Sequence, residues 1–196
     1  MLTSAGPPDA RVGVVDEDLG TALWQPDHMP FAGEPDPRGP DVVSLAVDYL
    51  DWCGSVLLRR LDGLDDLQLR RSVVPSGWSA LGLVKHSAAT RRYWVRHVFE
   101  GDDVDFSWPG SAEQEWEVTP DDTGEHLRSF YRQEHEHSLR VFRGSPPSTV
   151  SARDYGGTGV RPTLAWILLH LVQESARHAG HLDISRELTD GRTDFD

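Results

Sequence analysis

The sequence predicts an all-α protein built as a four-helix bundle, and three observations support this prediction. Apolar residues recur at alternating spacings of three and four along four long stretches, which is the pattern of one face of an α-helix. No alternating β-pattern of comparable length appears. The length of 196 residues suits one domain with an appendage. We therefore divide the chain into an N-terminal arm, residues 1–40, and a helical bundle, residues 41–192.

The arm is rich in proline, holding seven of the chain's 13 prolines. Proline interrupts helices and favours extended or turning chain. Apolar clusters at 12–15 and 23–31 are more frequent than a disordered tail would carry. We therefore expect an irregular arm that docks onto the bundle.

Four helices follow the arm in order. Asp41 is a suitable N-cap for the first, residues 41–61, whose apolar stripe runs through Val42, Leu45, Tyr49, Trp52 and Val56. The second covers residues 79–99, and an acidic loop follows to residue 120. The third covers residues 121–142 and the fourth residues 162–188, with a short strand or turn at 149–160 between them.

The composition excludes several classes of function. Acidic residues outnumber basic ones by 32 to 19, and the resulting charge of -13 repels nucleic acid and anionic lipid. The single cysteine, Cys53, excludes an internal disulfide and a cysteine-based zinc cluster, and its place beside Trp52 predicts a core residue. No secretory signal appears, nor an apolar stretch of the ~20 residues that cross a bilayer. We expect a cytoplasmic protein without nucleic-acid or membrane partners.

The fourth helix carries ionisable residues where a bundle seam is normally apolar. Glu174 and His178 are four residues apart, so their side chains share one face and can reach one divalent cation. An ion pair between them is one alternative, and pairing of Glu174 with His170 is another. One metal cannot take both histidines, which are separated by ~12 Å of helix rise. The predicted seam comprises Leu164, Ile167, Leu171, Glu174, His178, His181, Ser185 and Leu188.

A third ligand has to come from another helix, and the sequence offers two sources. His86 lies in the second helix, at the margin of its apolar arc. Glu134 and His137 interrupt the apolar spacing of the third helix, but a seam through Tyr131 and Phe142 would expose both. Pattern alone leaves the two sources open.

Two segments together resemble the DinB/YfiT-like superfamily of metal-dependent enzymes: LGLVKH at 81–86 and ESARHAGH at 174–181. The resemblance covers about residues 40–192 and is greatest to the actinobacterial mini-circle-type subgroup. It implies a four-helix bundle that binds one divalent metal through a histidine of the second helix and two residues four apart in the last. Carried onto this sequence, the ligands are His86, Glu174 and His178, with His181 beside them. Zinc is the expected metal, with nickel or iron as alternatives.

The resemblance also implies a chemistry. Many relatives have histidine where Glu174 stands, and the mixed ligand set is similar to that of the mycothiol-dependent maleylpyruvate isomerase. Three protein ligands leave a position for substrate, and a divalent ion acidifies a bound thiol. The implied activity is S-transfer or thiol-assisted isomerisation of a small-molecule substrate with a low-molecular-weight thiol. Candidates for contacting thiol or substrate are Arg92, Tyr93, Glu134, His137 and Arg177.

Two other functions stay open. A metal-activated water would make the protein a hydrolase that needs no thiol, and a bundle without turnover would be a metal- or ligand-binding stress protein. A carboxylate-bridged di-iron bundle is not supported, because the fourth helix lacks the Glu-x-x-His spacing. Because members of the superfamily often dimerise through bundle faces, we expect a homodimer.

Overall fold

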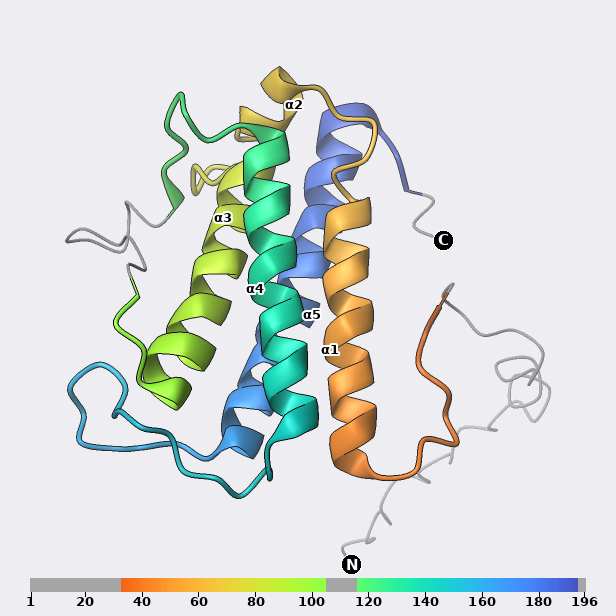
Figure 1. Ribbon diagram of the computed structural model, residues 1–196. Helices are drawn as coiled ribbons and strands as arrows, with labels where there is room; N and C mark the ends of the chain where they lie inside the picture. Colours follow the sequence, from red (N-terminus) through yellow and green to blue (C-terminus); the bar gives the residue numbers. More distant parts are fainter. Residues whose placement is uncertain (1–32, 105–115, 194–196) are drawn as a thin grey trace, which may run out of the picture. The chain divides into compact units, whose positions relative to one another are not determined.

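The computed structural model describes residues 33–104 and 116–193. Four long helical rods lie side by side in this part of the chain (Figure 1), which confirms the predicted all-α bundle. The predicted docking of the arm falls mainly on residues 1–32, outside the described residues. The rods are α1 (Val42–Arg59), α3 (Ala80–Arg91) continued by the π-helix η2 (Arg92–Glu100), α4 (Gly124–Gly144) and α5 (Leu164–Asp190).

Local capping fixes where the helices begin. The Asp41 side chain accepts hydrogen bonds from the first-turn amides of α1, and Ser79 and Thr163 do the same for α3 and α5. The cap of α4 is Thr123, so this helix begins three residues later than predicted. Asp122, expected near its first turn, instead forms an ion pair with Lys85 at 2.8 Å.

Two elements differ from the prediction. The short helix α2 (Asp66–Arg70) was missed, although a capping box joins Asp65 and Gln68 at its start, because five residues are too few to show a helical period. Of the strand or turn predicted at 149–160, the turn is confirmed, since the Thr158 amide donates to the Tyr155 carbonyl at 3.1 Å, and the strand does not form. Among the described residues, β-structure is limited to two isolated bridges, and one of them joins Val150 to Thr163.

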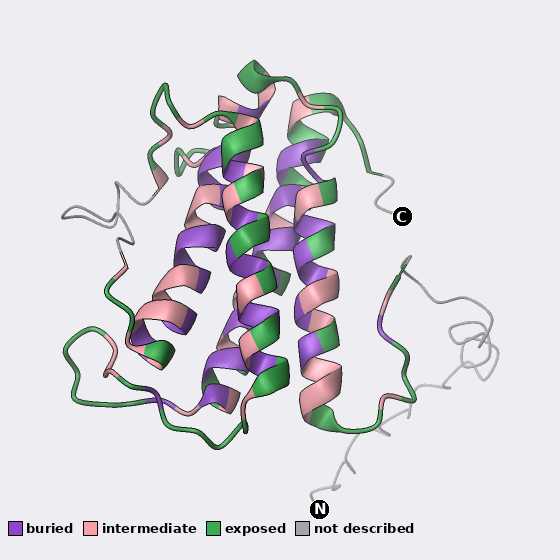
Figure 2. Ribbon diagram, in the orientation of Figure 1, coloured by how far each residue is buried: buried purple, intermediate pink, exposed green. Residues whose placement is uncertain are grey.

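The core lies along the inward faces of the helices, which are buried while the outward faces are exposed (Figure 2). Helix α1 packs chiefly against α5, and α3 against α4. The buried stripe of α5 passes through Leu171, Ser175, His178 and Leu182. The seam prediction is therefore wrong at Leu188, which is 56% exposed. Within the described residues, none of the helices has both the length and the apolar character needed to span a membrane.

Candidate metal centre

Three side chains from two helices converge inside the bundle. His86 comes from α3, and Glu174 and His178 come from successive turns of α5. One potential ligand atom of each lies within 4.8 Å of the other two. Glu174 Oε2 is 3.2 Å from His178 Nε2 and 4.0 Å from His86 Nε2. The tertiary structure thus brings together the three residues that the resemblance implied.

The surroundings of His178 show what these residues are suited to hold. Both of its ring nitrogens are buried, and no described residue forms a hydrogen bond with either of them. Nε2 has the Glu174 carboxylate at 3.2 Å, whereas Nδ1 has neither a hydrogen bond nor an ion pair with any described residue. A buried polar atom without a partner is costly in free energy. Burial above all, and then the positive charges of neighbouring histidines and arginines, lower the pKa of His178 to about 3. The ring is therefore neutral at physiological pH, which is the form that binds a metal.

The donor set also suits a divalent metal. Two imidazoles and one carboxylate form a familiar catalytic zinc set that leaves one position for substrate. Zinc–ligand bonds of about 2.1 Å place tetrahedral donors about 3.4 Å apart, close to the shorter separations seen here. His86, Glu174 and His178 therefore fit a zinc-like ion, and only small side-chain shifts are needed to close the set.

Trp116 covers one side of this centre. Its ring stacks on His86 at a centroid distance of 4.1 Å and an angle of 20°, and its edge faces His178 at 6.1 Å. The close approach depends on Gly82, where a Cβ atom would lie only 2.5 Å from the Trp116 carbonyl oxygen. Neither residue was predicted from the sequence. A glycine inside a helix, which costs about 1 kcal/mol relative to alanine, was the available signal.

We expect Gly82→Ala to destabilise the protein despite the better helix propensity of alanine. The gain in propensity is about 1 kcal/mol, whereas overpacking costs about 1–3 kcal/mol, so the free energy of unfolding should fall by up to about 2 kcal/mol. Urea denaturation measures this change. Gly180→Ala is the matched control, because nothing lies within 4 Å of its Cβ position. It should be neutral or stabilising, and an equal loss in both variants would contradict the role of Gly82.

His181 and Arg177 lie beside the centre, as the sequence suggested. The His181 ring is 5.8 Å from the rings of both His178 and Trp78, between centroids. Arg177 Nη1 is 3.9 Å from Glu174 Oε1, and the Arg177 side chain is 64% exposed. Both residues thus lie within about 6 Å of a potential ligand.

Glu134 and His137 make other contacts. Glu134 is buried on α4 and accepts hydrogen bonds from Arg92 and Arg96 of η2 at 2.8–3.0 Å. His137 Nε2 lies 2.7 Å from Glu100 Oε2, within hydrogen-bond distance. Neither belongs to the group of potential metal ligands, so the structure favours His86 as the third member.

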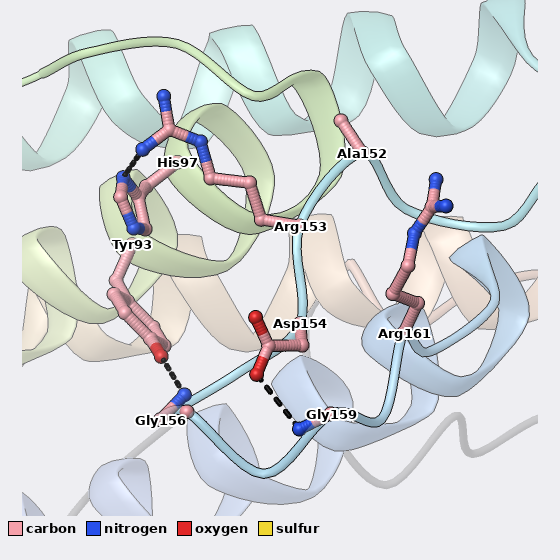
Figure 3. Close-up of a pocket in the computed structure, with 9 residues that line it drawn as sticks. Tyr93, His97, Ala152, Arg153, Asp154, Gly156, Gly159 and Arg161 are labelled. Atoms are coloured by element: carbon pink, nitrogen blue, oxygen red, sulfur yellow. Dashed lines mark hydrogen bonds between the residues drawn. The ribbon is translucent and has the colours of Figure 1, made fainter.

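Tyr93 lies at a separate cavity of about 850 Å³, between η2 and residues 152–161. Its hydroxyl accepts a hydrogen bond from the Gly156 amide, and Arg153 lies 3.3 Å from His97 (Figure 3). None of the three potential ligands lines this cavity. Tyr93 therefore does not belong to the metal centre.

His170 and Cys53 play structural parts. His170 stacks on Trp166 at a centroid distance of 5.0 Å and lies outside the group of potential ligands. Burial raises the pKa of the Cys53 thiol, which suits a core residue and not a nucleophile, as predicted from its sequence position.

Comparisons with known proteins give a family and a fold. The family model described as mycothiol-S-transferase matches residues 45–191, well over half of the chain. A crystal structure of a conserved protein from Enterococcus faecalis is similar with a TM-score of 0.55 and 18% identity, over 79% of this chain and 100% of that one. At this identity the likeness concerns the fold. A search of curated proteins gives no match.

Proposed function

Because the chain belongs to the mycothiol-S-transferase family, we propose that it transfers the sulfur of mycothiol, or of a similar small thiol, to a small electrophile. In this proposal a divalent metal is held by His86, Glu174 and His178. The family lies within the DinB/YfiT-like superfamily, so the resemblance noted in the sequence is confirmed. A thiol-assisted isomerisation is the related reaction in which the sulfur adds to the substrate and later leaves.

One observation carries the metal part of this proposal. His178 is neutral, buried and without a hydrogen-bond partner among the described residues, while a carboxylate and a second imidazole lie within 4.8 Å. A polar network without a metal would be expected to satisfy the ring nitrogens of His178. A metal ion satisfies one of them and uses the carboxylate as well.

The residues of the chain have distinct tasks in this reaction. A divalent ion held at this site supplies positive charge that favours the thiolate over the thiol. Trp116 covers His86 and limits the access of water on that side, while Arg177 and His181 are placed to orient the substrate. The transfer forms a bond from sulfur to a carbon of the electrophile and breaks the bond from that carbon to its leaving group. The thiol proton passes to water when the thiolate forms, and the electron pair of the broken bond departs with the leaving group.

The test uses mycothiol and monochlorobimane, an electrophile that loses chloride. We expect zinc-loaded protein to form the thioether, detected by mass spectrometry, faster than a protein-free control. Dialysis against a chelator should reduce the rate to that of the control, and added zinc should restore it. An unchanged rate after verified removal of the metal would contradict metal dependence.

The same samples separate the other two functions. Hydrolysis of an ester or amide panel without any thiol would favour a hydrolase. Stoichiometric metal binding with no turnover of any thiol and electrophile pair would favour a binding protein. Either result would overturn the S-transfer proposal.

A further inference from the structure

A buried arginine connects three helices next to the metal centre. Arg91 is the last residue of α3 and is only 2% exposed. Its guanidinium group donates hydrogen bonds to the Ser87 carbonyl of α3 at 3.0 Å, to His135 Nδ1 of α4 at 3.3 Å and to Ser175 Oγ of α5 at 2.9 Å. It also lies over the Tyr131 ring, 4.6 Å from the ring centroid.

The connection extends to the fourth helix through His135. Because arginine only donates hydrogen bonds, His135 Nδ1 is the acceptor and His135 Nε2 carries the proton, which it donates to Asp51 of α1 at 3.0 Å. Burial and the charge of Arg91 lower the pKa of His135 to about 4, consistent with a neutral ring. One polar chain therefore crosses all four long helices.

This arrangement is not a simple buried ion pair. Among the described residues, no carboxylate forms an ion pair with Arg91. A buried cation held by neutral partners has a large desolvation cost, so it is a poor choice for stability alone. What Arg91 contributes is the fixed planar fork of its guanidinium group, which sets the distances between the helices that it joins.

The bond from Arg91 to Ser175 joins the two helices that carry the potential metal ligands. Ser175 directly follows Glu174 and precedes His178 by three residues, and Arg91 follows His86 by five residues on α3. The bond spans the same helix pair as the ligands, about one turn away. A change in its length would change the separation between His86 and the Glu174–His178 pair.

We propose that Arg91, acting through Ser175, is a positioning residue that sets the spacing of α3 and α5 at the metal centre. This inference rests on the proposed metal site. The buried polar chain would hold His86 on α3 and the Glu174–His178 pair on α5 at the separation that one ion needs. Packing of the helices alone does not require this separation. Partners of this kind, which do not touch the metal, typically change its affinity about 10–100-fold when they are removed.

The sharpest test compares two buried serines. Ser175 and Ser138 both donate to a carbonyl four residues earlier in their own helix, at 2.6 and 2.7 Å, and both are at most 1% exposed. Of the two, Ser175 accepts a bond from Arg91. Ser175→Ala and Ser138→Ala thus remove the same group and the same internal bond, and differ in the contact with Arg91.

We expect Ser175→Ala to weaken zinc binding at least about tenfold, measured by competition with a chromophoric chelator. Ser138→Ala should bind zinc as the wild type does. The cobalt(II) form should also show a changed visible spectrum in Ser175→Ala only, a readout that a general loss of stability would not produce. Arg91→Lys should show the same two changes as Ser175→Ala, weaker zinc binding and an altered cobalt spectrum, because a lysine ammonium group lacks the planar fork of a guanidinium group.

The outcomes distinguish a failure of the proposed metal site from a failure of the positioning role of Arg91. If wild-type protein binds no zinc or cobalt, the proposed metal site itself fails. If wild type binds and both serine variants bind equally tightly with unchanged spectra, the metal site stands and the positioning role of Arg91 is overturned. Urea denaturation of the metal-free variants measures the change in stability separately. Ser175→Ala should lose more, because it leaves a buried Arg91 N–H without its acceptor, while the cobalt spectrum reports the geometry of the site.

Discussion

His178→Ala should lose stoichiometric metal binding. The substitution removes one of the three potential ligands and the only buried one of them, so zinc affinity should fall at least about 100-fold, beyond the range seen for partners that do not touch the metal. Elemental analysis of untagged protein after exhaustive dialysis measures the loss, because a histidine tag would carry its own metal. Wild type should retain about one ion per chain.

His137→Ala is the control for this experiment. His137 is a histidine of the same bundle that pairs with Glu100 and lies outside the group of potential ligands, so its loss should leave the metal content unchanged. Equal metal content in the two variants would contradict the ligand assignment. Absence of metal from wild type, even after zinc loading, would instead make the three residues a buried polar network, and a binding role without metal would then be favoured.

Gly54→Ala should lower the free energy of unfolding by up to about 2 kcal/mol, because an overpacking cost of about 1–3 kcal/mol outweighs the gain of about 1 kcal/mol in helix propensity. A Cβ atom at this buried position of α1 would lie 2.6 Å from His135 Cε1 and 3.0 Å from Tyr131 Oη. Neither neighbour can easily move. Tyr131 is fully buried, and His135 is held between Asp51 and Arg91. Gly54 therefore sets how closely α4 approaches α1.

Urea denaturation of Gly54→Ala beside Gly180→Ala measures this effect. Both changes add one methyl group to a long helix, but Gly180 has open space at its Cβ position. We expect a lower midpoint for Gly54→Ala, with an unchanged dependence on urea, and an equal or higher midpoint for Gly180→Ala. A stabilised Gly54→Ala would show that the contact between α1 and α4 is loose.

Features that depend on neighbours in the chain could be predicted from the sequence. Asp41, predicted as a cap, binds amides two and three residues away, so side-chain chemistry and position were sufficient. Ser79 and Thr163, which the sequence placed only at helix starts, act in the same way. The pairing of Glu174 with His178 follows from four-residue spacing on one helix. The choice of His86 as third member needed a family resemblance, because nothing local links α3 to α5.

Features that depend on contacts between helices could not be read from the sequence. Glu134 lies in a run of charged residues that suggests a solvated face, yet it is buried, because Arg92 and Arg96 of the π-helix η2 both reach it. The stacking of Trp116 on His86 requires a loop to meet a helix at Gly82. No periodicity encodes either contact.

The sequence by itself thus determined the class of fold, the approximate helix positions and one half of the metal centre, Glu174 and His178. The family resemblance pointed to His86 for the remaining half, and the tertiary structure places it beside Glu174 and His178. The tertiary structure alone decided which charged residues are buried and where Arg91 joins α3 to α4 and α5. The physical reason is the distance along the chain over which each kind of interaction acts. Helical period and capping act within about four residues of the chain, whereas a metal site and a buried polar chain are closed only when helices far apart in sequence pack together.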